Sequence, residues 1–143
     1  MDMVTVTVTK TRNMVIAVDF DGTIVEHDYP RIGKEKPFAV DVLKTLASEG
    51  HHLILYTSRD GDLLDEAVAF CRERGLVFYA VNSNHPPGWE FTSDEKKSAK
   101  VLADIYIDDR NLGGIPDWEA IYEMISGKVR SHRGKGLFGR RRK

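Results

Sequence analysis

The sequence predicts an α/β fold, in which a mainly parallel central sheet lies between helices as a three-layer sandwich. Short apolar segments bounded by turn-forming residues alternate along the chain with segments whose apolar residues recur at helical spacing. Such alternation is typical of parallel strands joined by crossover helices. At 143 residues the chain is long enough for one domain with a substantial core. We expect that domain to span residues 1–127.

Two strands and a helix are predicted between residues 14 and 56. Residues 14–19 (MVIAVD) are apolar up to the final acid, which is typical of a central strand buried on both faces. A helix is expected at residues 37–48, because Pro37 suits a first helical turn and Gly50 suits a left-handed end. The apolar residues 52–56 should form the second buried strand.

The second half of the chain continues the same alternation. The predicted elements are, in chain order, a helix that ends near Arg74, a strand at 76–81, a loop at 82–93, a strand at 103–107 and a helix at 118–125. Pro86, Pro87 and Gly88 exclude regular structure from the middle of the loop. The expected arrangement is Rossmann-like, with no second domain.

The net charge of −1 conceals two oppositely charged parts. Residues 128–143 contain eight Lys and Arg and no acid, so the rest of the chain has 13 basic and 22 acidic residues and a net charge of −9. Three glycines and only three apolar residues are interspersed in this basic tail, which we expect to be disordered. A nucleic-acid contact through the tail is the less favoured interpretation.

Composition excludes several classes of protein. No apolar run approaches the roughly 18 residues that a membrane span needs, and the alternating N-terminal segment lacks the basic start and apolar stretch of a signal peptide. We therefore expect a cytoplasmic protein without a membrane partner. The single cysteine, Cys71, falls on the apolar face of a predicted helix and should be a reduced core residue.

Polar side chains lie at or just after the ends of three predicted strands. These are Asp19 and Asp21, with Gly22 next to them, then Thr57 and Ser58, and finally Asp108 and Asp109. Because parallel strands share a direction, their carboxyl ends meet at one edge of the sheet, where a crevice should gather these groups. Lys96, Lys97 and Lys100 compete as a cation that reaches the same edge. Lys100 is preferred because it lies nearest to the last strand.

This set of residues suits phosphoryl transfer. Carboxylates that converge repel one another, and Mg²⁺, which prefers oxygen ligands, removes that repulsion by coordinating them. With the ion bound, an ionised Asp19 can approach a phosphate, and the hydroxyl of Thr57 or Ser58 can hold a phosphate oxygen. Gly22 permits a sharp turn that lets backbone amides line the phosphate pocket. Asp21 is near enough to protonate the leaving alkoxide and then deprotonate water.

The order of these motifs resembles that of the haloacid dehalogenase-like hydrolase superfamily. The resemblance covers residues 14–115 and rests on Asp19-Phe20-Asp21-Gly22-Thr23, Thr57, a lysine and Asp108-Asp109 in that order. It implies that Asp19 is the nucleophile and Asp21 the general acid and base, while Thr57 and the lysine bind phosphate. The implied Mg²⁺ ligands are Asp19, the backbone carbonyl of Asp21, Asp109 directly, and Asp108 directly or through water. An aspartate at position 21 favours phosphate esters as substrates.

The spacing of the motifs leaves no room for a cap domain. Thr57 follows Asp21 by 36 residues, and Asp108 follows Thr57 by 51. The expected flap, helices, strand and loop nearly exhaust both intervals. The chain therefore resembles the capless members of the superfamily, whose sites are open unless a neighbouring subunit or a large substrate covers them.

Two segments are expected to border this open site. Residues 22–36 should form a flap, and Arg59 or Trp89 should line the entrance. The period-two alternation of residues 4–9 suggests an edge strand within residues 1–13. An exposed site and an edge strand favour self-association as a homo-oligomer.

The predicted function is that of a Mg²⁺-dependent phosphomonoesterase, which hydrolyses a small phosphorylated metabolite through an aspartyl-phosphate intermediate. One alternative keeps the same site but takes nucleotides or nucleic-acid ends, because an open site and a basic tail suit a polyanion. Another is a phospho-accepting, non-catalytic switch module. Such modules resemble a different order, with the accepting aspartate after a middle strand, and no acid ends the predicted strand at 76–81.

Overall fold

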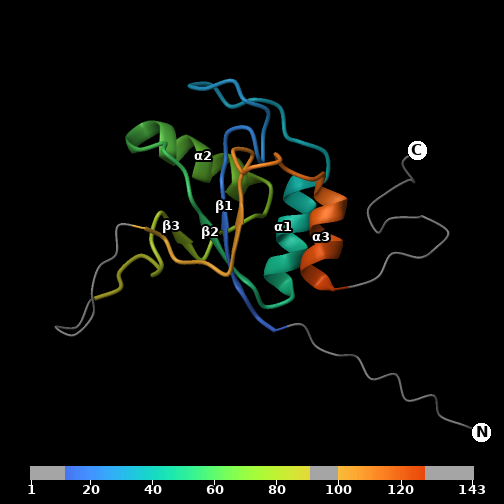
Figure 1. Ribbon diagram of the computed structural model, residues 1–143. Coiled ribbons are helices and arrows are strands. Elements are labelled where there is room, and N and C mark those ends of the chain that lie inside the picture. Colours follow the sequence, from blue (N-terminus) through green and yellow to red (C-terminus); the bar gives the residue numbers. More distant parts are fainter. Residues whose placement is uncertain (1–11, 91–99, 128–143) are drawn as a thin grey trace, which may run out of the picture.

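The computed structural model describes residues 12–90 and 100–127 (Figure 1). The expected edge strand at residues 4–9, the basic tail at 128–143, and the competing lysines Lys96 and Lys97 lie outside the described residues. None of the helices in the described part of the chain is long and apolar enough to span a membrane.

A parallel sheet forms the centre of the molecule. Its strands are β1 (Val15–Val18), β2 (His52–Leu55), β3 (Ala80–Val81) and β4 (Ile105–Ile107), which pair in the order β3-β2-β1-β4. Every pairing among these strands is parallel. The predicted α/β class and parallel sheet are therefore confirmed.

Three helices accompany the sheet, and these are α1 (Ala39–Ser48), α2 (Gly61–Glu73) and α3 (Trp118–Ser126). Each lies where the apolar pattern predicts a helix. Helix α1 begins two residues later than expected, because Phe38 before it adopts a left-handed conformation with φ of 65°. Helix α3 ends at Gly127, whose φ of 71° is the left-handed conformation that favours glycine.

All three helices contribute to one core on one face of the sheet. Alternate strand residues such as Ile16, Val18 and Leu53 share this core cluster with buried residues of the three helices. The connections β1-α1-β2 and β2-α2-β3 step in the same direction along the sheet, and right-handed crossovers then put both helices on the same face. Helices α1 and α3 lie side by side (Figure 1).

A smaller cluster, which includes Ala17 and Val101, covers the opposite face of the sheet. The described residues thus supply one helical layer, and the second helical layer of the predicted sandwich is not among them. The connection from β3 to β4 includes residues 91–99, which are not described. The three-layer arrangement therefore stays a prediction.

All four strands are shorter than predicted, and the later start of β3 and of β4 has a visible structural cause. The strand predicted at 76–81 is reduced to β3, because the amide of Leu76 bonds the carbonyl of Cys71 at the end of α2, and Val77 is 61% exposed. The strand predicted at 103–107 begins at Ile105. Asp104, the residue before β4, is fixed against β1 because its side chain accepts a hydrogen bond from the amide of Val15 at 2.8 Å.

Residues 22–36, which we call the flap, follow β1 and extend beyond the carboxyl edge of the sheet (Figure 1). Two backbone hydrogen bonds join its arms, from the Glu26 amide to the Lys34 carbonyl at 2.7 Å and from the Lys36 amide to the Ile24 carbonyl at 2.8 Å. The flap is thus an antiparallel ribbon, and the described residues contain no cap domain.

Candidate active site

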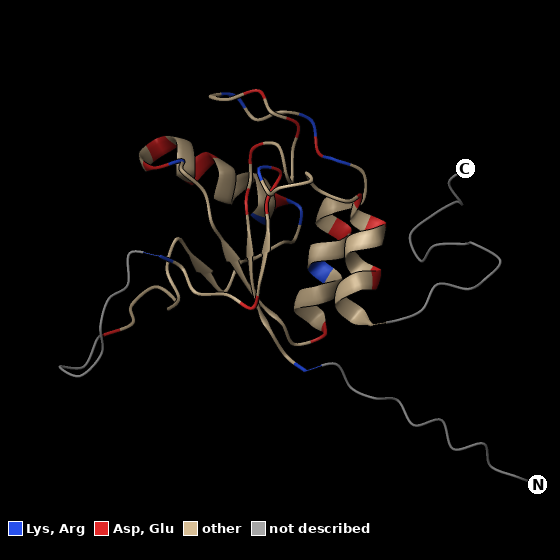
Figure 2. Ribbon diagram, viewed as in Figure 1, with Lys and Arg blue, Asp and Glu red and all other residues tan. Residues whose placement is uncertain are grey.

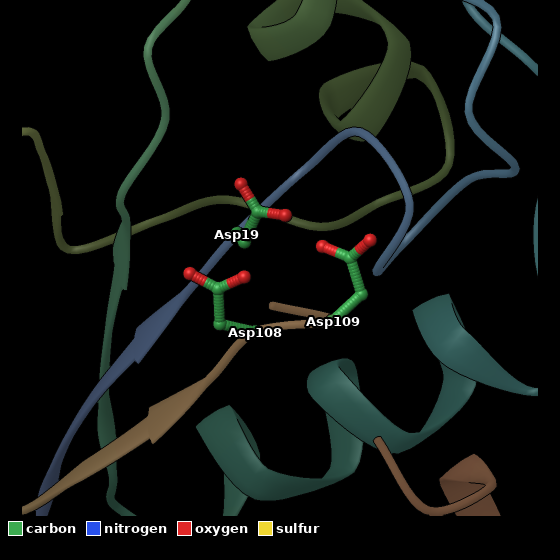
Figure 3. Close-up of side chains that lie close together, drawn as sticks. All are labelled: Asp19, Asp108 and Asp109. Carbon is green, nitrogen blue, oxygen red and sulfur yellow. The ribbon is translucent and has the colours of Figure 1, made fainter. Parts of the chain in front are cut away.

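Three carboxylates converge where β1 and β4 end. Asp19 follows β1, and Asp108 and Asp109 follow β4; carboxylate oxygens from the three residues lie within 4.8 Å of one another. Figure 3 shows the side chains turned toward a common space. We call these three residues the acidic cluster. Such a spacing of oxygen donors could hold a divalent cation.

Strand pairing accounts for this convergence. Val18 pairs with Ile107 in adjacent parallel strands, and the Asp19 amide donates to the Ile107 carbonyl at 2.9 Å. Asp19 and Asp108 are therefore the next residues along neighbouring strands, which brings their side chains to one edge. Figure 2 shows acidic and basic residues together in the loops at this end of the sheet.

Gly22 allows Asp109 to approach β1 closely. Its φ is +87°, a conformation that L side chains rarely adopt, and a Cβ at this position would overlap with the Asp109 carboxylate. Glycine is therefore required at position 22 for two reasons: the turn has a left-handed conformation, and the Asp109 carboxylate occupies the space of a side chain. No substrate contact by Gly22 is needed to explain it.

Thr23 links the two strands beneath the acidic cluster, and it is fully buried. Its hydroxyl donates to Asp19 Oδ2 at 2.9 Å and accepts from the Asp109 amide at 3.0 Å. The Thr23 carbonyl in turn accepts from Trp118 Nε1 at 3.0 Å. The sequence predicts no role for Thr23 beyond its place in the motif, yet it orients two of the three acids.

The acidic cluster changes the protonation of Asp19. Burial, the charge of Asp108 and a hydrogen bond with Asp109 raise the pKa of Asp19 from 3.8 to about 7, against the lowering effect of the Thr23 hydroxyl. A bound cation would offset each raising cause by favouring the ionised form. The donor set therefore fits an oxygen-preferring ion such as Mg²⁺.

Asp21 lies apart from the acidic cluster and pairs with Arg59. Two hydrogen bonds join them, from Arg59 Nε to Asp21 Oδ2 at 2.7 Å and from Arg59 Nη2 to Asp21 Oδ1 at 2.8 Å. The guanidinium also donates to the carbonyls of Arg31 in the flap and Leu63 in α2. Arg59 thus fixes Asp21 in a bidentate pair and ties the flap to α2.

The expectation that Arg59 lines the entrance is wrong. Its side chain is only 1% exposed overall, because the paired charge of Asp21 and the faces of Phe20 and Tyr29 enclose it. The sequence places Arg59 directly after the strand-end Thr57-Ser58, and so at the edge of the sheet where the acids lie, but it does not indicate that the side chain is buried. Trp89 stacks on His85 and lines a separate cavity of about 220 Å³.

A cavity of about 620 Å³ opens beside the acidic cluster. The predicted residues among its lining are Asp19, Asp21, Thr57, Ser58 and Asp108. The structure thus brings residues from the ends of three strands to one cavity. The Thr57 hydroxyl accepts a hydrogen bond from the Arg59 amide at 3.1 Å, so it also begins the turn that carries Arg59.

Other residues of this cavity were not predicted. The flap supplies His27 and Tyr29, β2 leads into Tyr56, and Arg110 follows the acidic pair. Lys100 does not line the cavity; its Nζ lies 5.5 Å from the centre of the Tyr106 ring. Among the described residues that line this cavity, Arg110 is the basic residue that lies nearest in sequence to Asp108 and Asp109.

The fold and the site define a class of protein: a small α/β domain with an acidic, cation-compatible site at the carboxyl edge of a parallel sheet. No protein-family model matches the chain, and no curated protein was found to match it. The chain is similar to the solved structure of a conserved protein from Bacteroides thetaiotaomicron, with 58% identity and a TM-score of 0.75 over 83% of this chain and 94% of that chain. It belongs to the same family as that conserved protein.

Proposed function

We propose that the protein is a Mg²⁺-dependent phosphomonoesterase of the haloacid dehalogenase-like type. The observation that carries the proposal is the acidic cluster, in which a raised pKa marks Asp19 and two further acids stand beside it. The adjoining cavity, lined by Thr57 and Ser58, offers hydroxyls to a phosphate group. When bound, Mg²⁺ would offset negative charge on the acids and the phosphate.

Asp19 is the nucleophile in this proposal. Its carboxylate attacks phosphorus, the bond from phosphorus to the ester oxygen breaks, and that oxygen leaves as an alcohol after taking a proton from Asp21. Water then attacks the aspartyl-phosphate, gives its proton to Asp21, and releases phosphate and free Asp19. Thr23 keeps Asp19 Oδ2 in a fixed hydrogen bond throughout.

Arg59 places Asp21 for these proton transfers. The bidentate pair holds both carboxylate oxygens of Asp21, a residue that lines the cavity beside the acidic cluster. Because Arg59 also donates to the Arg31 carbonyl, the position of the flap and the position of Asp21 are connected.

A nucleotide or nucleic-acid-end substrate is the second candidate. Two aromatic side chains, Tyr29 and Tyr56, line the cavity together with the cationic Arg110. Aromatic faces stack on bases, and a guanidinium pairs with additional phosphates. The phospho-accepting switch is less favoured, because β3 is followed by Asn82 rather than by an acid.

Replacement of the nucleophile tests the proposal. Asp19→Asn should lower turnover of a generic aryl phosphate with Mg²⁺ by on the order of 10³-fold or more, because the amide cannot form the phosphorylated intermediate. Asp65→Asn, which changes an exposed acid on α2, is the matched control and should keep full activity. EDTA should abolish wild-type turnover. Near-full activity of Asp19→Asn would refute the assignment, and a single stoichiometric phosphorylation without turnover would favour the switch.

A further inference from the structure

A second cavity lies between the loop that enters α1 and the first turn of α3. It has a volume of about 360 Å³ and shares no lining residue with the cavity beside the acidic cluster. Figure 1 shows that α1 and α3 run side by side and begin at the same end. The loops that enter the two helices, which contain Lys36 and Ile115, close its sides.

Glu119 lines this cavity and is only 7% exposed. Its Oε2 is buried and has no hydrogen-bond partner among the described residues. The ion pairs found in the described part of the chain do not include Glu119. A buried carboxylate oxygen without a donor is unfavourable, and native proteins satisfy nearly all such atoms. The Glu119 carboxylate, which belongs to a residue of the cavity wall, therefore has unmet capacity for a hydrogen-bond donor.

The other residues that line the cavity indicate the kind of ligand that would carry such a donor. Phe38, Ile115 and Trp118 provide an apolar and aromatic wall, and Trp118 is only 2% exposed. One basic residue, Lys36, and two acids, Asp117 and Glu119, also line the cavity, so its formal charge is −1. Because a carboxylate only accepts hydrogen bonds, a complementary ligand is a donor with a single positive charge and an apolar body.

We propose that this cavity is a binding site for a small organic ammonium ion. The ammonium group donates to the Glu119 carboxylate, and the apolar body of the ligand contacts Phe38, Ile115 and Trp118. Aromatic faces attract cations and also bury apolar surface. Phe38 and Trp118 can therefore stabilise both the ammonium group and the apolar body of the ligand. The site is independent of the proposed phosphatase activity, although Trp118 also supports Thr23.

Trp118 provides a direct measurement of binding. The chain has two tryptophans, so a Trp89→Phe background leaves Trp118 as the reporter, and Trp89 lines neither cavity. Titration with 2-phenylethylammonium should give a saturable change in Trp118 fluorescence. The neutral analogue 2-phenylethanol should bind at least about tenfold more weakly, because it cannot make a charge-assisted hydrogen bond. Absence of saturation, or equal affinity for the two probes, would overturn the proposal.

Substitution of the carboxylate then locates the site. Glu119→Gln in the same background should weaken 2-phenylethylammonium binding at least about tenfold, with the thermal unfolding midpoint unchanged or raised. Glu123→Gln is the matched control, because Glu123 lies one turn later on α3 and does not line the cavity. Equal affinity of the two variants would overturn the assignment to Glu119. If Glu119→Gln does not fold, the comparison of charged and neutral probes on the parent protein decides.

Discussion

Arg59 and Asp21 form the closest ion pair between side chains of the described residues, with an Nε to Oδ2 distance of 2.7 Å. A guanidinium that is almost wholly buried makes four hydrogen bonds here, two to Asp21 and one each to two carbonyls. Arginine and lysine are not equivalent at such a bidentate site, since an ammonium group cannot reproduce the planar fork. The arrangement identifies Arg59 as a positioning residue for Asp21.

Arg59→Lys should lower kcat by about 10- to 100-fold while KM and Mg²⁺ affinity change less than about threefold, because misplacement of Asp21 affects proton transfer but not the acidic cluster. Steady-state kinetics and calorimetric Mg²⁺ titration measure these quantities. Arg72→Lys, an exposed change on α2, is the control. A parallel loss of kcat and Mg²⁺ affinity would show instead that the whole site has collapsed.

His51 predicts a pH dependence of stability that is separate from the active site. Its ring is 4% exposed and Nδ1 accepts a hydrogen bond from the Met14 amide at 3.1 Å. Burial lowers the pKa of His51 below its ordinary value of 6.5. The unfolded chain therefore binds a proton at His51 more readily than the folded chain does, so the stability that His51 contributes is full above pH 6.5 and is lost as pH drops through the lowered pKa.

Urea unfolding at several pH values tests this sign. The raised pKa of Asp19 makes the free energy of unfolding rise as the pH falls below about 7, and His51 opposes that rise. Between pH 7.5 and 5, His51→Gln should therefore gain more free energy of unfolding than the wild type, because the opposing group is gone. His27→Gln changes an exposed histidine of the flap and should behave as the wild type does. An identical pH dependence of wild type and His51→Gln would contradict the assignment.

The acidic cluster was predictable residue by residue, whereas the Arg59 contact was not. Asp19, Asp108 and Asp109 are placed by a simple rule, because acids directly after parallel strands meet at one sheet edge. The partner of Asp21 lies 38 residues away, and burial of an arginine depends on how the flap and α2 close over it. No local pattern encodes that closure. Lys100 was likewise placed by sequence proximity alone, which does not determine where a side chain points.

At the scale of elements, the turn after β1 determines whether Asp109, which follows β4, can reach the acidic cluster. Gly22 has a left-handed conformation and leaves the space that the Asp109 carboxylate occupies. Periodicity located every helix of the described chain and most strands. It overestimated β3, because residues 76–79 have apolar side chains but only the Tyr79 amide bonds β2 there.

Gly22→Ala should weaken Mg²⁺ binding at least tenfold, because the added methyl group displaces Asp109 from the acidic cluster. Gly88→Ala is a matched control, since its φ of +88° is nearly the same but no atom lies within 4 Å of an added Cβ. Both variants should lose about 1 to 2 kcal/mol of stability from the left-handed conformation. Calorimetric titration and urea unfolding of the pair separate the two effects. Equal Mg²⁺ affinity would show that Asp109 is not a ligand.

At the scale of the whole molecule, the acidic cluster exists only in the folded chain. Asp19 and Asp108 are 89 residues apart in sequence and meet because β1 and β4, from opposite halves of the chain, pair in the sheet. A ligand that binds only the folded state stabilises it in proportion to the logarithm of its concentration over Kd. The proposed Mg²⁺ site therefore links metal binding to global stability.

Mg²⁺ at 100 times its Kd should raise the free energy of unfolding by about 2.7 kcal/mol, which corresponds to an increase of roughly 8 °C in Tm for a domain of this size. The shift should continue to grow by about 1.4 kcal/mol for each further tenfold increase in concentration. Asp108→Asn combined with Asp109→Asn should remove it, because one remaining carboxylate cannot hold the ion, whereas Asp65→Asn should leave it intact. Thermal unfolding with increasing Mg²⁺ measures the effect. A wild-type Tm independent of Mg²⁺ would exclude a metal site at the acidic cluster, and an undiminished shift in the double variant would place the ion elsewhere.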